Sequence, residues 1–210
     1  MSVGMILLIV IAVLTLFGIT QRVFDRMKLN DKMALAFVAA MFVGGIIPDV
    51  QITDQISFNI GGALIPLILC VYLFVKSERP VEKWRSIIAS LVTGGIVYGL
   101  LRILPEEPET IVFDPNYVCG VAAAIIAYIL GRSRRCAFIA AVVGSMLSSV
   151  INAVVLAIQG RPYTLALGGG GFFDTVILSG VLAVVLCEIM GEIWERAVKN
   201  REKHEQEDAQ

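Results

Sequence analysis

The apolar residues of this 210-residue chain are gathered into long blocks that contain few charges. A helix that crosses a bilayer needs about 20 mostly apolar residues, because each residue lengthens the helix by only about 1.5 Å. Seven blocks approach this length, at residues 2–20, 33–50, 58–76, 85–104, 115–131, 135–159 and 172–191. With 57% hydrophobic and 17% charged residues, the chain is too apolar for a soluble domain of its size. The blocks therefore predict an all-α fold, a polytopic transmembrane helix bundle of about seven spans.

The basic residues predict how this bundle crosses the membrane. Loops that are rich in Lys and Arg remain in the cytoplasm. Of the 17 basic residues, all but Arg102 and Arg161 lie in the loops after the first, third and fifth blocks, at the block ends that border these loops, or in the C-terminal tail. A seven-span arrangement puts these four segments on one side of the membrane. We therefore predict an extracytoplasmic N-terminus, a cytoplasmic C-terminus and a multi-pass protein of the cell (inner or plasma) membrane.

The same pattern predicts one transmembrane helical domain, residues 1–191, followed by a charged cytoplasmic tail, residues 192–210. We interpret the first block as a retained helix and not as a signal peptide, because no basic region precedes it and Gln21–Arg22 follows it. Residues 58–101 resemble residues 113–156, which indicates a helix-hairpin repeat. The two copies run in the same direction, unlike the inverted repeats of many transporters.

An aromatic residue followed by Asn or Asp stands at or just before the start of three of the blocks. The pairs are Phe58–Asn59, Phe113–Asp114 and Phe173–Asp174. Asn and Asp are preferred helix N-caps because their side-chain oxygen accepts from a free backbone N–H, and a carboxylate is also stabilised by the helix dipole. In this interpretation the glycines before the last pair form the turn into the seventh span. They are Gly168, Gly169, Gly170 and Gly171.

The same residues also support a functional interpretation. Asn59, Asp114 and Asp174 would lie at one depth on three helices that run in the same direction, with Asp49 nearby. If these helices are neighbours, the side chains converge near the extracytoplasmic face, where carboxylates held close bind a cation or share a proton. We therefore predict a binding site made of these four residues. The glycine run would then be a flexible loop, or would let the backbone approach a ligand closely.

Small and weakly polar residues recur at helical spacing in the even-numbered blocks, which indicates close helix packing. The sixth block carries Ser145, Ser148, Ser149 and Asn152. Asn152 stands out among them, because a buried amide inside a membrane needs a partner. In the third block, Pro66 follows a pair of glycines and predicts a kink.

The sequence argues against most enzyme classes and against nucleic-acid binding. It contains no nucleotide-binding loop, no Ser/His pair and no metal-ligand spacing, and its formal net charge is −1. The four cysteines are scattered singly through apolar blocks, as buried small residues are. We expect no cofactor and no metal. The expected partners are the lipid bilayer, a small solute or cation, and further copies of the chain in a homo-oligomer.

The stretches FNIGGALIPL, FDP and GGGGFFD resemble those of an uncharacterised family of small seven-helix prokaryotic integral membrane proteins, a domain of unknown function. This resemblance covers the chain from about residue 33 onward and implies a membrane location and an architecture, but no activity. A weaker resemblance is to intramembrane aspartyl proteases, which carry Gly-x-Gly-Asp on one helix and a second Asp on another. Here two phenylalanines separate the glycines from Asp174, Asp114 follows Phe113, and the Pro-Ala-Leu motif of that family is absent.

These observations leave three functions open. The first is a small-solute or ion transporter or channel component with an acidic site on the extracytoplasmic side. The second is an intramembrane diaspartyl protease-like enzyme, in which Asp114 and Asp174 would be the catalytic pair by resemblance. The third is a membrane scaffold or assembly partner, in which the Asn and Asp residues only cap helices.

Overall fold

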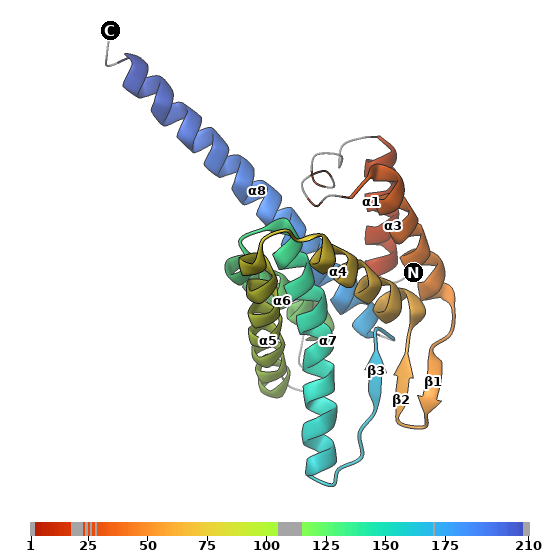
Figure 1. The fold of residues 1–210 in the computed structure, drawn as a ribbon. Coiled ribbons are helices and arrows are strands. Elements are labelled where there is room, and N and C mark those ends of the chain that lie inside the picture. Colours follow the sequence, from red (N-terminus) through yellow and green to blue (C-terminus); the bar gives the residue numbers. More distant parts are fainter. Residues whose placement is uncertain are drawn as a thin grey trace.

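The computed structural model describes residues 3–17, 23, 25, 27, 29–104, 115–169 and 171–207. Helices dominate these residues: α1 (Val3–Leu16), α3 (Asp31–Ile46), α4 (Ile65–Lys76), α5 (Pro80–Ile103), α6 (Pro115–Gly131), α7 (Arg134–Ile158) and α8 (Gly171–Glu207). A short π-helix, η1 (Ile60–Leu64), leads directly into α4. Each helix falls on one of the seven apolar blocks, so the predicted all-α bundle is confirmed for the described part of the chain (Figure 1).

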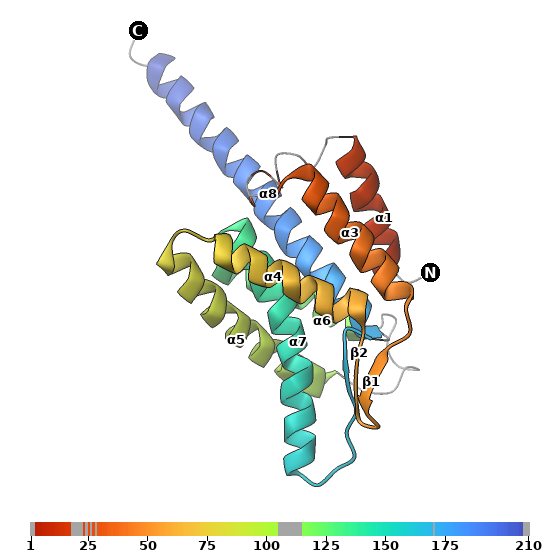
Figure 2. The ribbon, with the colours of Figure 1, turned by 45° about the vertical axis from the view of Figure 1, so that its right-hand side comes forward.

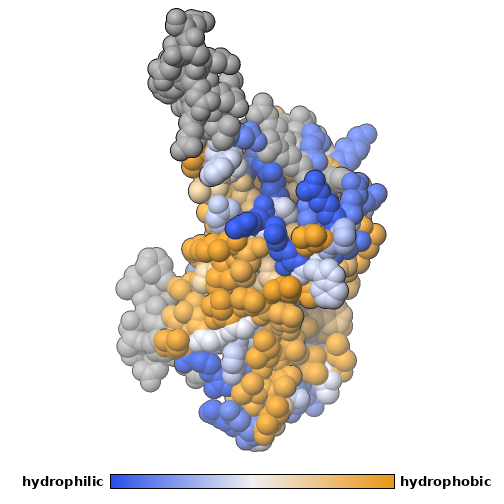
Figure 3. Space-filling model, turned by 60° about the vertical axis from the view of Figure 1, so that its left-hand side comes forward, coloured by the Kyte–Doolittle hydropathy of each residue, from blue (hydrophilic) through white to orange (hydrophobic). Residues whose placement is uncertain are grey.

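Within the described residues, three helices are long and apolar enough to cross a bilayer, namely α5, α7 and the part of α8 from Thr175 to Glu195. Shorter apolar helices cover Val3–Thr15, Lys32–Ile46, Ile60–Lys76 and Pro115–Gly131. Large apolar side chains such as Trp84, Ile88 and Leu91 are exposed on α5, and Figure 3 shows a broad apolar surface with hydrophilic residues gathered mainly above it. Such a surface is unfavourable in water and suits lipid. The chain is therefore a membrane protein, while the number of spans and their sidedness stay predictions.

Helix α7 lies at the centre of the bundle. It packs against α4, α5, α6 and α8, and residues 136–142 in its first half are all buried. Helices α1 and α3 pack against each other and join the rest of the protein through η1, α4 and α8 (Figures 1 and 2). The C-terminal part of α8 projects beyond the bundle. The helices that surround α7 therefore determine the shape of the membrane domain.

Small side chains allow the helices to approach α7 closely. A Cβ atom added at Gly144 of α7 would lie only 2.7 Å from the Thr93 Cβ of α5. Another cluster joins α5, α6, α7 and α8 through very small residues: Ala89, Ala124, Ala127, Ala137, Ala140, Ala141, Ala183 and Cys187. Lipid is as apolar as these side chains, so close contact and not exclusion from water stabilises such interfaces. Packing therefore explains most of the small-residue pattern in the sequence.

A small sheet, which the sequence patterns did not predict, lies at one end of the bundle. Strands β1 (Val50–Thr53) and β2 (Ile56–Phe58) form an antiparallel hairpin, and β3 (Leu165–Leu167) pairs in parallel with β2. The second block was predicted to be helical to residue 50, but α3 ends at Ile46. Pro48 disfavours helix in the residue before it, and Ile47 is extended. The sheet thereby joins the segment before η1 to the segment before α8.

Helix α8 differs from the prediction at its start. It begins at Gly171, so Asp174 lies within its first turn and is not the N-cap that the Phe–Asp pattern predicted. Acidic residues are favoured in the first turn as well as at the cap, which is why the pattern misplaces the boundary. At its other end α8 continues without a break to Glu207, past the predicted domain boundary at residue 191. In the sequence Glu195 precedes Lys199 by four residues, a spacing that favours helix in this charged tail.

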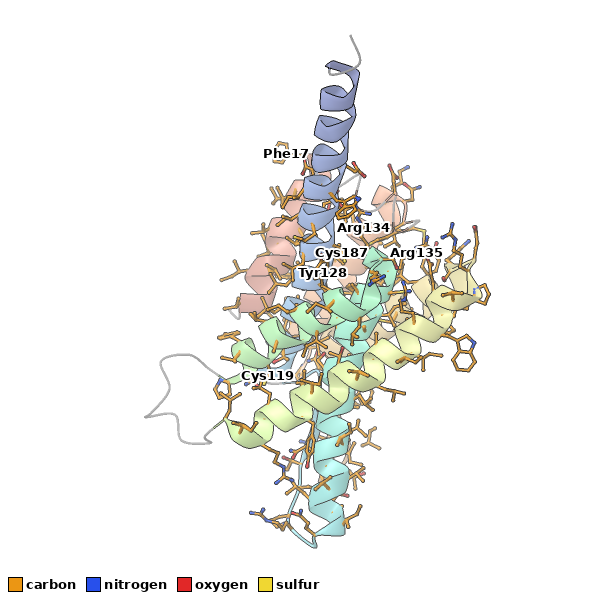
Figure 4. All side chains as sticks on the ribbon, turned by 90° about the vertical axis from the view of Figure 1, so that its left-hand side faces the viewer. Phe17, Cys119, Tyr128, Arg134, Arg135 and Cys187 are labelled. Carbon is orange, nitrogen blue, oxygen red and sulfur yellow. The ribbon has the colours of Figure 1, made fainter. Side chains whose placement is uncertain are left out.

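The basic segments after α4 and before α7 lie together at the end of the bundle away from the sheet. The Arg135 guanidinium donates to the Lys76 carbonyl at 3.3 Å, which places the start of α7 beside the end of α4. Arg134 forms an ion pair with Glu188 of α8, with 2.5 Å between Nε and Oε2. Figure 4 shows Arg134 and Arg135 at this end together with Cys187. The predicted sidedness requires this grouping, because it puts the basic segments after the third and fifth blocks on the same side of the membrane.

The α5–α7 contact predicts that two glycines respond differently to substitution. Gly144→Ala places a methyl group against Thr93 and should destabilise the bundle by about 1–3 kcal/mol, the usual range for overpacking. Gly95→Ala on α5 is the control, because a Cβ atom there meets nothing within 4 Å. Thermal unfolding in detergent should give a lower midpoint for Gly144→Ala only. Equal midpoints for the two variants would show that the interface is loosely packed.

Cysteine labelling tests the predicted sidedness. The native cysteines are all buried, so a membrane-impermeant maleimide should leave the wild-type protein unlabelled. Asp54→Cys, in the exposed turn between β1 and β2, should react in intact cells. Glu78→Cys, between α4 and α5, should react only after the membrane is permeabilised. Labelling of Glu78→Cys alone in intact cells would reverse the orientation.

Candidate functional site

Asn59, the residue before η1, is the polar centre of the end that holds the sheet. Its side chain is buried, with 5% of its surface exposed. The Oδ1 atom accepts from the Gly62 N–H at 2.9 Å and so caps η1. The Nδ2 atom donates to the Ile47 carbonyl at 3.2 Å and to Asp49 Oδ1 at 2.9 Å, while the Asn59 backbone N–H donates to the Leu167 carbonyl at 2.9 Å. The cap interpretation is therefore confirmed for Asn59, and the same residue links α3, the sheet and α4.

Asp49 brings a carboxylate to this centre from the segment between α3 and β1. Its side chain is exposed, and its Oδ1 accepts from the buried Asn59 amide. Among the described residues, no Lys or Arg forms an ion pair with it. An ionised carboxylate has several acceptor positions, and one hydrogen bond leaves the others free for a ligand. The structure thus brings Asp49 and Asn59 together, while their role in binding stays a prediction.

Glycines allow three backbone segments to meet around the buried amide. Gly61 lies so close to the end of α3 that a Cβ atom would collide with the α3 backbone, and Gly62 and Gly168 approach each other in the same way. Gly168 has a φ of +65°, which glycine adopts without strain. A Cβ atom at Gly169 would lie 2.7 Å from the Asp49 Cγ. At Gly61, Gly62 and Gly168 no larger residue fits without moving the backbone, whereas at Gly169 the Asp49 side chain would have to move.

This packing accounts for part of the glycine run that was predicted to be a flexible loop. Gly168 and Gly169 are buried in the contact, Gly170 lies outside the described residues, and Gly171 opens α8. Gly168 and Gly169 therefore show a close backbone approach, while the flexible loop stays a prediction. What approaches the glycines is a neighbouring part of the same chain, with the Asp49 carboxylate beside them.

Near Pro66, where the sequence predicts a kink, the structure has the π-helix η1, and the kink itself stays a prediction. Proline cannot donate a backbone hydrogen bond, and Pro66 is buried in the first turn of α4. Just before it the chain is wound more widely, with the Ile65 N–H donating to the Ile60 carbonyl. Single π-turns are rare and occur frequently at functional sites. Irregular backbone at membrane depth is tolerated only where protein buries it or where it lines a cavity.

The convergence predicted for the third, fifth and seventh blocks is partly visible. Helix α8 packs against both α6 and η1. Near the start of the two helices, the Thr175 hydroxyl donates to the Asn116 carbonyl at 3.0 Å. Asp114 lies outside the described residues, and Asp174 is described only in its backbone. The separation of these two carboxylates, and with it the protease interpretation, therefore stays a prediction.

A polar cavity of about 590 Å³ lies between the ends of α5 and α7 and strand β3. Its polar lining comes from Arg102, Ser149, Asn152, Arg161 and Thr164. Asn152 was singled out in the sequence, but the two arginines were used only to predict sidedness. The signal that could have found them is their isolation, since they are the two basic residues outside the predicted cytoplasmic segments.

A second cavity, of about 240 Å³, lies between the α1–α3 pair and helices α7 and α8. Its lining is almost entirely apolar, and its one carboxylate, Glu188, is already paired with Arg134. Within the described residues there is also no group of three or more side chains that could hold a metal ion. The Asn59–Asp49 centre and the polar cavity are therefore two places where the described structure offers groups to a polar ligand.

Asn59→Asp separates capping from the other bonds of this side chain. Aspartate caps as well as asparagine, so a residue that only caps would tolerate the change. We expect the free energy of unfolding to fall by about 1–3 kcal/mol instead. The new carboxylate would face Asp49 and the Ile47 carbonyl, where an N–H donor is needed. This loss of stability should be smaller at low pH, where one of the two carboxyl groups is protonated. Thermal unfolding across pH measures both effects.

The control for this change exchanges the two side chains. Combining Asn59→Asp with Asp49→Asn restores one amide and one carboxylate to the pair, and should recover part of the lost stability. A single Asn59→Asp variant as stable as the wild type at neutral pH would contradict the hydrogen bonds described here.

Comparison with known proteins identifies a family and no activity. No curated protein and no solved structure matches the chain. A family model described as "Protein of unknown function (DUF1614)" matches residues 14–186. The match covers most of the chain and confirms the resemblance to an uncharacterised family that the FNIGGALIPL, FDP and GGGGFFD stretches indicated. The chain therefore belongs to the DUF1614 family of unknown function.

Proposed function

We propose that this protein is a transporter or channel component of the plasma membrane that binds a small cation with Asp49 at its extracytoplasmic end. The observation that carries the proposal is the Asp49 carboxylate, which is exposed, held by the buried Asn59 amide and unpaired with any described Lys or Arg. A fixed negative charge in a protein of low local polarity attracts cations more strongly than the same charge in bulk water.

The backbone around Asp49 also supports a transport function. The carboxylate lies beside the irregular start of a helix, where η1 precedes α4 and the Asn59 side chain accepts from the buried Gly62 N–H. Transporters often build their ion and substrate sites at irregular or broken helices, because unwound backbone and helix ends supply polar groups inside the membrane. Asp114 and Asp174 belong to this proposal as further carboxylates, since the helices that they precede or begin are neighbours at Thr175 and Asn116.

A scaffold role is the alternative that the experiment must separate. In a scaffold Asp49 would only position the Asn59 amide, and replacing the carboxylate by another hydrogen-bond acceptor would have no effect beyond stability. Asp49→Asn makes this distinction, because asparagine still offers an acceptor to Asn59 and removes the charge.

The test uses the full chain reconstituted into liposomes and measures uptake of radioactive sodium, potassium and calcium ions. We expect uptake of at least one of these cations above protein-free liposomes, and a loss of about tenfold or more in Asp49→Asn, consistent with loss of a charge interaction of about 1.4 kcal/mol or more. Asp54→Asn is the matched control, because Asp54 is an exposed carboxylate in the adjacent β-turn. Asp114→Asn and Asp174→Asn extend the test to the other two carboxylates.

Two outcomes would rule out the proposal. One is the absence of uptake for every cation by folded wild-type protein. The other is uptake that Asp49→Asn, Asp114→Asn and Asp174→Asn all leave unchanged, which would mean that the carboxylates have no part in transport.

A further inference from the structure

We infer that the polar cavity between α5, α7 and β3 is a binding site for an oxyanion, a phosphate or carboxylate group, held by Arg102 and Arg161. This site is separate from Asp49 and opposite to it in charge. The inference does not rest on the proposed cation transport, because it follows from a different set of residues.

The two arginines supply the charge of the cavity. Arg102 lies in the last turn of α5, and Arg161 follows the end of α7. Among the described residues, neither forms an ion pair with a carboxylate. A guanidinium presents parallel N–H donors whose spacing matches the oxygens of a carboxylate or phosphate, so two arginines facing one cavity favour an oxyanion.

Tyr98 holds Arg102 in position for this role. The Arg102 Nε donates to the Tyr98 hydroxyl at 3.2 Å, and the guanidinium carbon lies 5.4 Å from the centre of the Tyr98 ring. Both contacts come from one turn earlier in the same helix. They occupy the ring face and one donor, and among the described residues no contact engages the terminal Nη groups, which can bind a ligand. A side chain already held in place loses less freedom when a ligand binds.

Ser149 supplies an independent observation that points to a ligand. Its side chain lines the cavity and is 9% exposed, and its hydroxyl has no hydrogen-bond partner among the described residues. The other serines of α7 behave differently, since Ser145 and Ser148 donate to carbonyls of their own helix at 2.9 and 2.7 Å. A buried hydroxyl without a partner is unfavourable unless something in the cavity accepts from it. An oxyanion is such an acceptor, and the neighbouring Asn152 amide can donate to it as well.

The position of the cavity defines two sources for the oxyanion. The cavity lies at the end of the bundle with the sheet, because Thr164 and Ala166 of the β3 segment line it. In the predicted orientation this end is extracytoplasmic. The oxyanion is therefore either a free solute or the headgroup of an anionic lipid in the outer leaflet, and both present the same group to the arginines.

The experiment uses the full chain in nanodiscs and measures the thermal unfolding midpoint. In phosphatidylcholine nanodiscs, inorganic phosphate is titrated against chloride at constant ionic strength. In a second arm, phosphatidylglycerol replaces part of the phosphatidylcholine without added phosphate. A saturable rise in the midpoint with phosphate identifies a free solute, whereas a rise with phosphatidylglycerol alone identifies a lipid headgroup.

Variants connect either rise to the cavity. Arg102→Gln and Arg161→Gln should each weaken binding and so raise the half-saturating phosphate or lipid concentration by about tenfold or more. Arg85→Gln is the matched control, because Arg85 lies on the same helix α5 near its opposite end and outside this cavity. Arg102→Lys should also bind phosphate or lipid more weakly, since lysine keeps the charge without the paired donors.

Ser149→Ala gives a second readout that a merely structural role would not produce. Without ligand the variant should be at least as stable as the wild type, because a buried hydroxyl that lacks a partner has been removed. With phosphate or lipid its half-saturating concentration should rise a few-fold. The inference is overturned if neither arm raises the wild-type midpoint, or if the rise is the same in both arginine variants as in Arg85→Gln.

Discussion

The buried carboxamide of Asn59 joins parts of the protein that helix packing alone would leave apart. It reaches the end of α3 through the Ile47 carbonyl and the start of η1 through the Gly62 N–H, and its own backbone reaches β3 through the Leu167 carbonyl. Hydrogen bonds of about 3 Å require the three backbones to come close together. Glycine at the contact points makes this approach feasible, because any Cβ atom there would collide with a neighbouring backbone. The sheet, the π-helix and the position of Asp49 all depend on this arrangement.

Helix α7 shows where close packing ends and where polar groups become available. From Cys136 to Val142 the side chains are buried, and the hydroxyls of Ser145 and Ser148 are satisfied within the helix. Farther along, Ser149 and Asn152 face the polar cavity instead. Close contact between small residues stabilises a membrane bundle, but it leaves no room for a ligand. The cavity occurs where the neighbouring helices no longer cover α7.

The end of the protein with the sheet holds two charged features of opposite sign. Asp49 contacts the Gly169 backbone, while Arg102 and Arg161 line the cavity with residues of the β3 segment. The short stretch from Thr164 to Gly169 therefore borders both features. This explains why the chain needs a strand and a glycine turn before α8: one side of the stretch contributes to a cavity wall and the other side packs on backbone. Charges of both signs also keep this end polar next to a surface suited to lipid.

The sequence by itself determined the helices, the membrane class and the cap at Asn59, because hydrophobic length and capping are properties of neighbouring residues. It also indicated the family through short local motifs. It did not determine the sheet, since the pairing of β2 with β3 joins Ile56 to Leu165 and no local pattern encodes such a partner. The seventh apolar block placed the start of α8 to within one residue, but the Phe–Asp pattern pointed to Asp174, because aspartate is favoured both as a cap and in the first helical turn. Only the tertiary structure brought Arg102, Arg161 and Ser149 to one cavity. Each looks ordinary in its own segment, and their shared chemistry arises from distances that helix packing sets.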